Sequence, residues 1–209
     1  MPTPTELAQA FKRAIDRQDA AALMRLARTY HQLYLRMGDK LDSLLLAISK
    51  LDEPTKGQVF RLAQYKNLIS ALETELTKFG TFTELEIRSN SQAAIELAVK
   101  QTEAFLSAAG YTMTRSLPTD AIYNMLGFLQ EGSPLWKRIG ELAPYHTQRV
   151  ADALLEGIAF GYNPAKTARM FESVMGGGLT DAMRMTRTTQ LYASREASRA
   201  MYVANDDII

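Results

Sequence analysis

Four arginines near the end of the sequence have the chemistry and spacing to bind an anionic partner. They are Arg184, Arg187, Arg195 and Arg199. At 3.6 residues per turn, a helix places them within about a third of its circumference. Each guanidinium group can donate two parallel hydrogen bonds to a carboxylate or a phosphate. We therefore predict a row that binds a partner protein or phosphate; the alternative is a solvated face partly paired with Asp181 and Glu196.

The helix that carries this row is expected to run from about residue 179 to about residue 205. Its opposite side holds the small side chains of Ala182, Thr186, Ala193, Ala197 and Ala200. Small side chains allow a neighbouring helix to approach closely. The pattern therefore predicts that this side is buried and that the arginines face outward.

A sharp corner is predicted ahead of this helix, in the segment Gly161-Tyr162-Asn163-Pro164. Glycine can adopt the left-handed conformation that closes a helix. Asparagine accepts a hydrogen bond from the free amides of the next first turn, and proline suits the first position of a helix. Gly157 lies just upstream and is assigned to the same corner. We predict that Gly161, Asn163 and Pro164 fix the angle between two helices.

The helices around this corner are expected to form a compact module from Pro144 to Asn205. Its expected core residues are Leu154, Ile158, Tyr162, Met170, Phe171 and Leu191. Three consecutive glycines, at positions 176–178, interrupt the module and predict either a flexible link or a phosphate-binding loop. The loop has weaker support, because no strand precedes the glycines and no Lys-Ser or Lys-Thr pair follows them.

Catalytic chemistry has little support in this sequence. There is no cysteine, which excludes thiolate nucleophiles and thiolate metal sites. The two histidines are His31, expected at a helix surface, and His146, which has no carboxylate at a fixed spacing to orient it. No His-Glu-x-x-His or Gly-x-Ser-x-Gly motif is present. We expect no enzymatic activity, no cofactor and no metal site.

Helical periodicity extends over almost all of the 209 residues, which predicts an all-α fold. Long helical hairpins are expected in the first half, followed by shorter helices. Gly38, Gly80 and Gly110 are expected to end helices. Thr3, Thr83 and Ser133 are expected to cap helices, Thr119 or Asp120 to cap one that runs to about Gln130, and Pro144 to open another. A seam of apolar residues at alternating steps of three and four predicts packing within the chain, or alternatively an intermolecular coiled coil. The seam consists of Leu62, Tyr65, Ile69, Leu72, Leu76 and Phe79.

The helical pattern lapses between about residues 111 and 118, which predicts a boundary between a long-helix bundle over 1–112 and a second module over 119–209. The formal net charge is +1, so no global field attracts nucleic acid or a membrane. The start of the sequence lacks a signal peptide, and no apolar run approaches the length of a membrane span. We expect a soluble protein that is made in a cytoplasm.

The stretch from about Leu154 to Ile209 resembles the phage head morphogenesis family, the minor head proteins similar to the F protein of phage Mu. The residues that carry the resemblance are Leu155-Glu156-Gly157-Ile158, Gly161-Tyr162-Asn163-Pro164, Ala168, Ala182, Arg184, Arg187-Thr188, Tyr202 and Asn205. The resemblance covers roughly a quarter of the chain. Thr189 stands where the family usually has glutamate after Arg-Thr, and the sequence does not extend into the family's Cys-x-x-Cys and histidine segment, which could hold a metal.

The resemblance implies a structural role in the head of a tailed phage or prophage. Expected partners are the portal protein and other capsid or scaffold proteins, with packaged DNA as a further candidate. The expected location is the head interior or the portal vertex, after synthesis in the bacterial cytoplasm, and several copies or a homo-oligomer are expected around the portal. The resemblance further implies a part in head assembly, DNA packaging or ejection. The alternative function is a helical nucleic-acid-binding module that uses the arginine row on phosphates.

Overall fold

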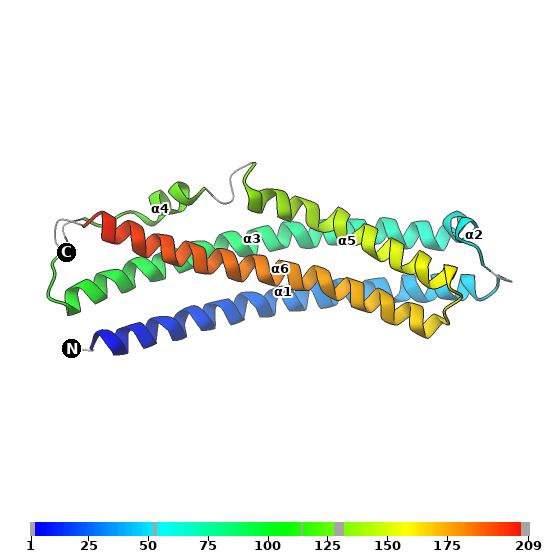
Figure 1. Cartoon of the computed structure of the whole chain (residues 1–209), viewed down its shortest axis with the longest axis horizontal. Helices are drawn as coiled ribbons and strands as arrows, with labels where there is room; N and C mark the ends of the chain where they lie inside the picture. The colour runs from blue at the N-terminus through cyan, green and yellow to red at the C-terminus, as the bar shows by residue number, and fades with distance from the viewer. Residues whose placement is uncertain (1–2, 52–53, 114, 128–131, 206–209) are drawn as a thin grey trace. The chain divides into compact units, whose positions relative to one another are not determined.

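The computed structural model describes residues 3–51, 54–113, 115–127 and 132–205. Over these residues the secondary structure is helical, with no strand, so the predicted all-α fold is confirmed. The helices are α1 (Pro4–Ile48), α2 (Lys56–Arg61), α3 (Ala63–Ala108), α4 (Thr119–Leu126), α5 (Pro134–Ala159) and α6 (Pro164–Val203) (Figure 1). The later helices are each shorter than α1 and α3, as expected.

Several helix ends lie where the sequence predicts them. At the start of α1, Thr3 and Glu6 form a reciprocal cap, in which the Thr3 amide donates to Glu6 Oε2 at 2.7 Å and the Glu6 amide donates to Thr3 Oγ1 at 3.3 Å. Gly110 follows α3 with a φ of 87°, the left-handed conformation that ends a helix. Ser133 caps α5 by accepting a hydrogen bond from the Trp136 amide at 3.2 Å.

The predicted breaks at Gly38 and Gly80 are wrong, because α1 and α3 continue through them. Thr83 is buried inside α3 and donates its hydroxyl to the Phe79 carbonyl at 2.8 Å. One internal glycine costs a helix only about 1 kcal/mol. The buried side chains of Met37 and Leu41 continue the packed stripe across Gly38, and that burial outweighs the cost.

Two other predicted helix starts are also corrected. Pro144 lies inside α5, which begins ten residues earlier at Pro134. Thr119 is the first helical residue of α4 and its cap position is Pro118, where no side chain makes a capping hydrogen bond. The α4 helix ends at Leu126, followed by Gly127 with a φ of 57°; the predicted end near residue 130 lies outside the described residues.

The chain divides into two compact units, and each draws on segments that are far apart in the sequence. Unit 1 comprises Met1–Arg25, Glu84–Trp136 and Met183–Ile209, and unit 2 comprises Leu26–Thr83 and Lys137–Ala182. Helices α1, α3 and α6 each contribute residues to both units. The expected ranges 1–112 and 119–209 divide the chain differently, since each of them contributes residues to both units.

In unit 1, α1 runs antiparallel to α3. The Gln18 side chain donates to the Asn90 carbonyl at 2.9 Å, and further along α1 the guanidinium group of Arg25 pairs with Glu86 at 2.8 Å. An apolar cluster joins α3, α4 and α6, with Phe11, Met113 and Leu117 packed against it. The cluster consists of Ile95, Ala98, Val99, Ile122, Ala193, Ala197 and Met201. These contacts hold the C-terminal half of α6 in a fixed orientation within the unit.

In unit 2, leucines from α1 and α3 form most of the core, together with residues of α5 and α6. The largest fully buried side chains of this unit are Leu26, Leu33, Met37, Leu44, Leu68, Leu72, Leu76, Leu154 and Phe171. Most of the predicted seam packs within the chain, since Tyr65, Leu72, Leu76 and Phe79 are buried and the Phe79 ring meets Tyr30 of α1 edge-on at 4.8 Å. Leu62, its first residue, lies between α2 and α3, and Ile69 is half-buried. The two helices expected on either side of Gly80 form one continuous α3.

Candidate partner-binding interface on helix α6

The buried side of α6 matches the side predicted from its small residues. Ala182 is fully buried in unit 2, and Thr186, Ala193 and Ala197 are buried in unit 1, while Ala200 is half-buried. With no bulky side chain on this side, the helix backbone lies close to its neighbours. The prediction that this side faces the protein interior is confirmed.

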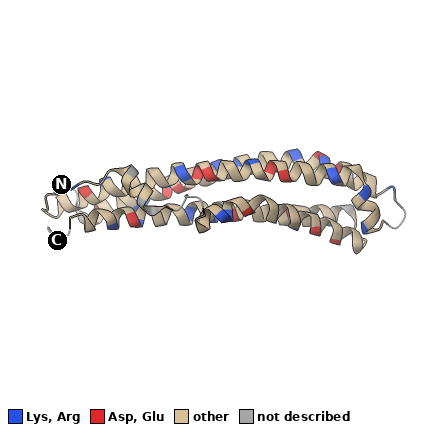
Figure 2. Ribbon diagram, turned by 90° about the horizontal axis from the view of Figure 1, so that it is seen from above, with Lys and Arg blue, Asp and Glu red and all other residues tan. Residues whose placement is uncertain are grey.

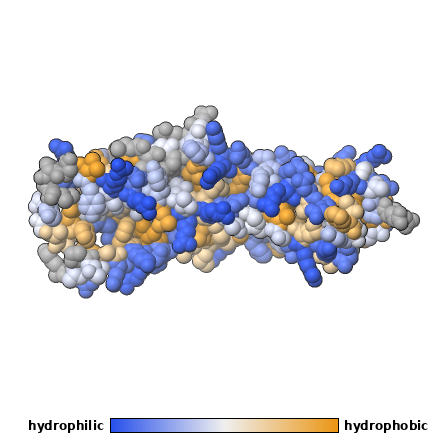
Figure 3. Space-filling model, viewed as in Figure 1, coloured by the Kyte–Doolittle hydropathy of each residue, from blue (hydrophilic) through white to orange (hydrophobic). Residues whose placement is uncertain are grey.

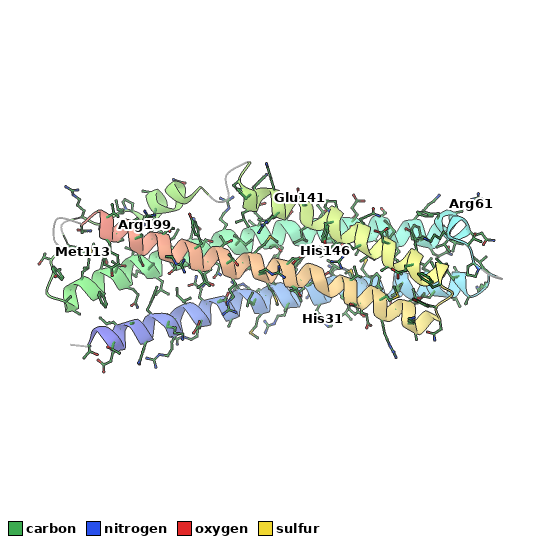
Figure 4. All side chains as sticks on the ribbon, viewed as in Figure 1. His31, Arg61, Met113, Glu141, His146 and Arg199 are labelled. Atoms are coloured by element: carbon green, nitrogen blue, oxygen red, sulfur yellow. The ribbon has the colours of Figure 1, made fainter. Side chains whose placement is uncertain are left out.

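The opposite side of α6 is exposed in unit 1, and we call it the α6 arginine face. It consists of Arg184, Arg187, Leu191, Tyr192, Arg195, Arg199, Tyr202 and Val203. Leu191 and Tyr192 are each 47% exposed and Val203 is 63% exposed, so large apolar groups lie among the guanidinium groups. The predicted core position of Leu191 is therefore wrong: it shares the arginine side of the helix, which points away from the packed cluster. Figure 4 labels Arg199 on this helix, and Figure 3 shows apolar surface interleaved with polar surface on the side that it displays.

The ion pairs of Arg187 and Arg199 assign these two arginines different roles. Arg187 Nε lies 3.5 Å from Asp19 Oδ2 of α1, and Asp19 is only 8% exposed. Burial raises the pKa of Asp19, and the positive charge of Arg187 opposes this shift. Arg187 therefore supports the packing of unit 1. Arg199 pairs with Glu196 at 3.3 Å on the helix surface. The alternative of a solvated arginine face had predicted a pair with Glu196.

The end of α6 is fastened to the connector that precedes α4. Asn205 is fully buried; its side-chain oxygen accepts a hydrogen bond from the Arg115 amide at 3.0 Å, and its side-chain nitrogen donates to the Arg115 carbonyl at 2.9 Å. The sequence marked Asn205 only through the family resemblance. These two hydrogen bonds give it a structural role at the end of the arginine face.

The corner between α5 and α6, in unit 2, has the predicted geometry. Gly161 has a φ of 61°, Pro164 is the first residue of α6, and Asn163 Oδ1 accepts a hydrogen bond from the Lys166 amide at 2.8 Å. Tyr162 is half-buried, and the Lys166 ammonium lies 3.1 Å from the centre of its ring. The corner therefore sets the direction in which α6 leaves α5.

Gly157 contributes to this corner as a contact between helices, because it lies inside α5 and not at its end. A Cβ atom at this position would lie 2.9 Å from Thr167 Oγ1 of α6, and Thr167 is buried. The absence of a side chain thus allows α5 and α6 to approach each other.

Both predictions for the three glycines at 176–178 are wrong, because all three are helical residues of α6. A Cβ atom on Gly178 would lie 2.9 Å from the Tyr30 hydroxyl, which donates to the Met175 carbonyl, and 3.5 Å from the His146 ring. A Cβ atom on Gly177 would lie 3.5 Å from the same ring. The glycines therefore open a space in which α1 and α5 pack side chains directly against the α6 backbone.

Alanine substitutions can separate the low helix propensity of glycine from the space that its missing side chain leaves for neighbours. Gly176→Ala is expected to stabilise the protein by about 1 kcal/mol, because the position is exposed, has no neighbour within 4 Å, and gains helix propensity. Gly178→Ala is expected to destabilise it by about 1–2 kcal/mol, because the new methyl group must displace the buried Tyr30 hydroxyl. Urea unfolding measures both values. If both variants increased the free energy of unfolding by the same amount, the packing role of Gly178 would be contradicted.

A buried histidine–carboxylate pair is the main feature of unit 2 that the sequence did not reveal. His146 of α5 is 1% exposed, and its Nε2 lies 3.2 Å from Asp181 Oδ2 of α6. No carboxylate stands at a fixed sequence spacing from His146, and its partner lies 35 residues away on another helix. His31, in contrast, is exposed on α1 as expected (Figure 4). His146 is buried and the Asp181 side chain is 39% exposed, so the pair joins α5 to α6 at the edge of the core of unit 2.

Stability is expected to depend on pH through this histidine. Burial lowers the pKa of His146 below its ordinary 6.5, and the Asp181 carboxylate only partly opposes the shift. The unfolded chain then binds a proton more readily than the folded chain as pH falls. The free energy of unfolding should decrease as pH drops from about 6.5 through the lowered pKa, and His146→Gln should flatten this dependence. His31→Gln is the matched control. If His31→Gln flattens the pH dependence of the free energy of unfolding and His146→Gln does not, His146 is not the titrating group.

No family model, curated protein or solved structure matches this chain. Among the residues that the structure describes, no helix is long and apolar enough to cross a membrane. The same residues include no cluster of three or more His, Cys, Asp or Glu side chains suited to a metal ion. Function is therefore inferred from the geometry of α6 and from the family resemblance of residues 154–209.

Proposed function

We propose that this chain is a structural minor head protein of a tailed phage or prophage. In this role it docks at the portal or the inner capsid and supports head assembly, DNA packaging or ejection. It acts by binding and not by catalysis, in several copies around the portal vertex. The observation that carries the proposal is the α6 arginine face, which belongs to the segment that resembles the phage head morphogenesis family.

The arrangement of this face suits a docking role. Its arginines project from one side of a helix whose other side is packed in the core of unit 1, so the charges are presented on a rigid support. Tyrosine and arginine are the residues most enriched at the energetic centres of protein interfaces. Figure 2 shows that basic and acidic residues both occur along the helices. The α6 arginine face is therefore the best candidate for charge-specific recognition.

Nucleic-acid binding is the second candidate function, and one observation favours it. Tyr192 and Tyr202 are exposed beside Arg195 and Arg199, and proteins bind single-stranded nucleic acid by combining arginine contacts to phosphates with aromatic stacking on bases. The two functions are compatible, because packaged DNA lies close to the portal. Salt dependence separates them, since binding through several phosphate contacts weakens by orders of magnitude between about 0.05 M and about 0.2 M salt.

Co-purification with the portal ring of the same phage tests the proposal. The full chain is incubated with assembled portal rings, with scaffold protein, and with single-stranded and duplex DNA, and each complex is isolated over a series of salt concentrations. The proposal expects capture by the portal or another head protein that persists at about 0.2 M salt. Capture by DNA alone would favour the second function, and capture by neither would contradict both.

A further inference from the structure

We propose that the α6 arginine face binds an acidic amphipathic helix presented by a protein partner. This inference rests on the proposed docking function and names the chemistry of the docked segment. It follows from three properties of the face, which are the line along which its residues lie, the mixture of apolar and basic groups, and the balance of charge. Each property favours a helix over the other occupants.

The central residues of the face form a straight seam. Arg184, Leu191, Arg195 and Tyr202 follow one another at steps of seven, four and seven residues. Steps of this kind return to nearly the same side of a helix, and they are the spacing with which one helix packs along another. The seam extends over about 27 Å at 1.5 Å per residue, which matches about five turns of a partner helix.

Exposed apolar groups argue for a protein partner and against phosphate alone. Leu191 is 47% exposed, and Val203, at the C-terminal end of α6, is 63% exposed. A phosphate backbone would pair with the guanidinium groups but would leave these apolar side chains without an apolar contact. An amphipathic helix can cover both kinds of group, because it places leucine-like side chains along its centre and carboxylates at its edges.

The charge of the face argues for an acidic partner and against a second copy of this chain. Four arginines lie on it, against two carboxylates, since Arg187 pairs with Asp19 and Arg199 pairs with Glu196. Two copies meeting through this face would bring like charges together, which is unfavourable. Glutamate or aspartate side chains on the partner helix would instead accept hydrogen bonds from the exposed guanidinium groups of Arg195 and Arg199.

The test uses the full chain and a designed peptide of about 20 residues as probe, the length that spans the seam. The peptide is helical, with leucine along one stripe and glutamate on both sides of it, and a scrambled peptide of identical composition is the control. Fluorescence anisotropy should show at least about tenfold tighter binding of the amphipathic peptide than of the scrambled peptide. Equal affinities would overturn the proposal, because charge alone would then account for binding. Tighter binding of duplex or single-stranded DNA than of the amphipathic peptide would also overturn it.

Apolar variants provide a second arm of the experiment. Leu191→Ser with Tyr202→Ser should weaken peptide binding by about tenfold, since these are the two uncharged large side chains of the seam. The matched control is Leu46→Ser with Leu85→Ser, at leucines that are 60% and 58% exposed on other helices, and it should leave binding unchanged. Loss of binding in the control pair alone would contradict the proposed site.

If the portal captures the chain but the amphipathic peptide does not bind, the helical occupant is wrong while the docking function stands. If the peptide binds but no head protein captures the chain, the surface chemistry stands and the phage role fails.

Discussion

Reversal of charge at Arg195 and Arg199 is expected to abolish capture of this chain by the portal ring while its helical circular dichroism remains unchanged. Both side chains are exposed on the α6 arginine face, and the surface pair of Arg199 with Glu196 contributes at most about 1 kcal/mol to stability. If each arginine contributes about 1–2 kcal/mol to docking, the double variant should bind about a hundredfold more weakly. Pull-down with portal rings and circular dichroism together measure the two effects.

The choice of positions in this variant follows from the structure. Arg187 is left unchanged, because its reversal would place a second negative charge beside the buried Asp19 and disturb the fold of unit 1. Lys12→Glu with Lys100→Glu is the matched control, since both lysines are exposed in unit 1 and the change in net charge is the same. An equal loss of capture in the control would mean that overall charge, and not this face, drives docking.

Gly157→Leu is expected to destabilise the packing of α5 against α6 strongly. The added side chain must occupy space already held by Thr167 of α6, whose Oγ1 and Cγ2 would lie 2.9 and 3.1 Å from the new Cβ. Because Thr167 is buried, α5 and α6 must move apart, which we expect to cost about 3 kcal/mol. Urea unfolding followed by circular dichroism measures this loss.

Gly140→Leu is the control for this substitution in the same helix. Gly140 is exposed on α5 and has no neighbour within 4 Å, so leucine there should change stability by less than about 1 kcal/mol, in the stabilising direction. Similar stabilities for the two leucine variants would show that the close contact of α5 with α6 is not needed for the fold.

The sequence predicted the fold class and the exposed side of α6 because both depend on periodicity. Apolar residues at steps of three and four predict helices directly, and alanines on the side opposite the arginines indicate which side of α6 is packed. The helix caps at Thr3 and Asn163 were also predictable from the sequence, since each side chain accepts a hydrogen bond from the amide three positions further along the chain.

Glycine was the main source of error, because its effect depends on neighbours that are distant in the sequence. Gly38 is tolerated by burial on either side of it, and Gly178 is required because Tyr30 and His146 fill the space beside it. The pair of His146 with Asp181 was missed for the same reason, since no local spacing links α5 to α6. Gly177 and Gly178 were the available signal, because a helix keeps such weak helix formers where side chains such as those of Tyr30 and His146 pack against its backbone.

Oxidative footprinting of the full chain, free and bound to the portal ring, reports which exposed side chains a partner covers. If the α6 arginine face is the docking surface, labelling of Leu191, Tyr192 and Tyr202 falls on binding, while labelling of Tyr145 and Phe160, which are 54% and 66% exposed in unit 2, stays the same. Protection of Tyr145 or Phe160 with no change on the α6 arginine face would contradict this docking role.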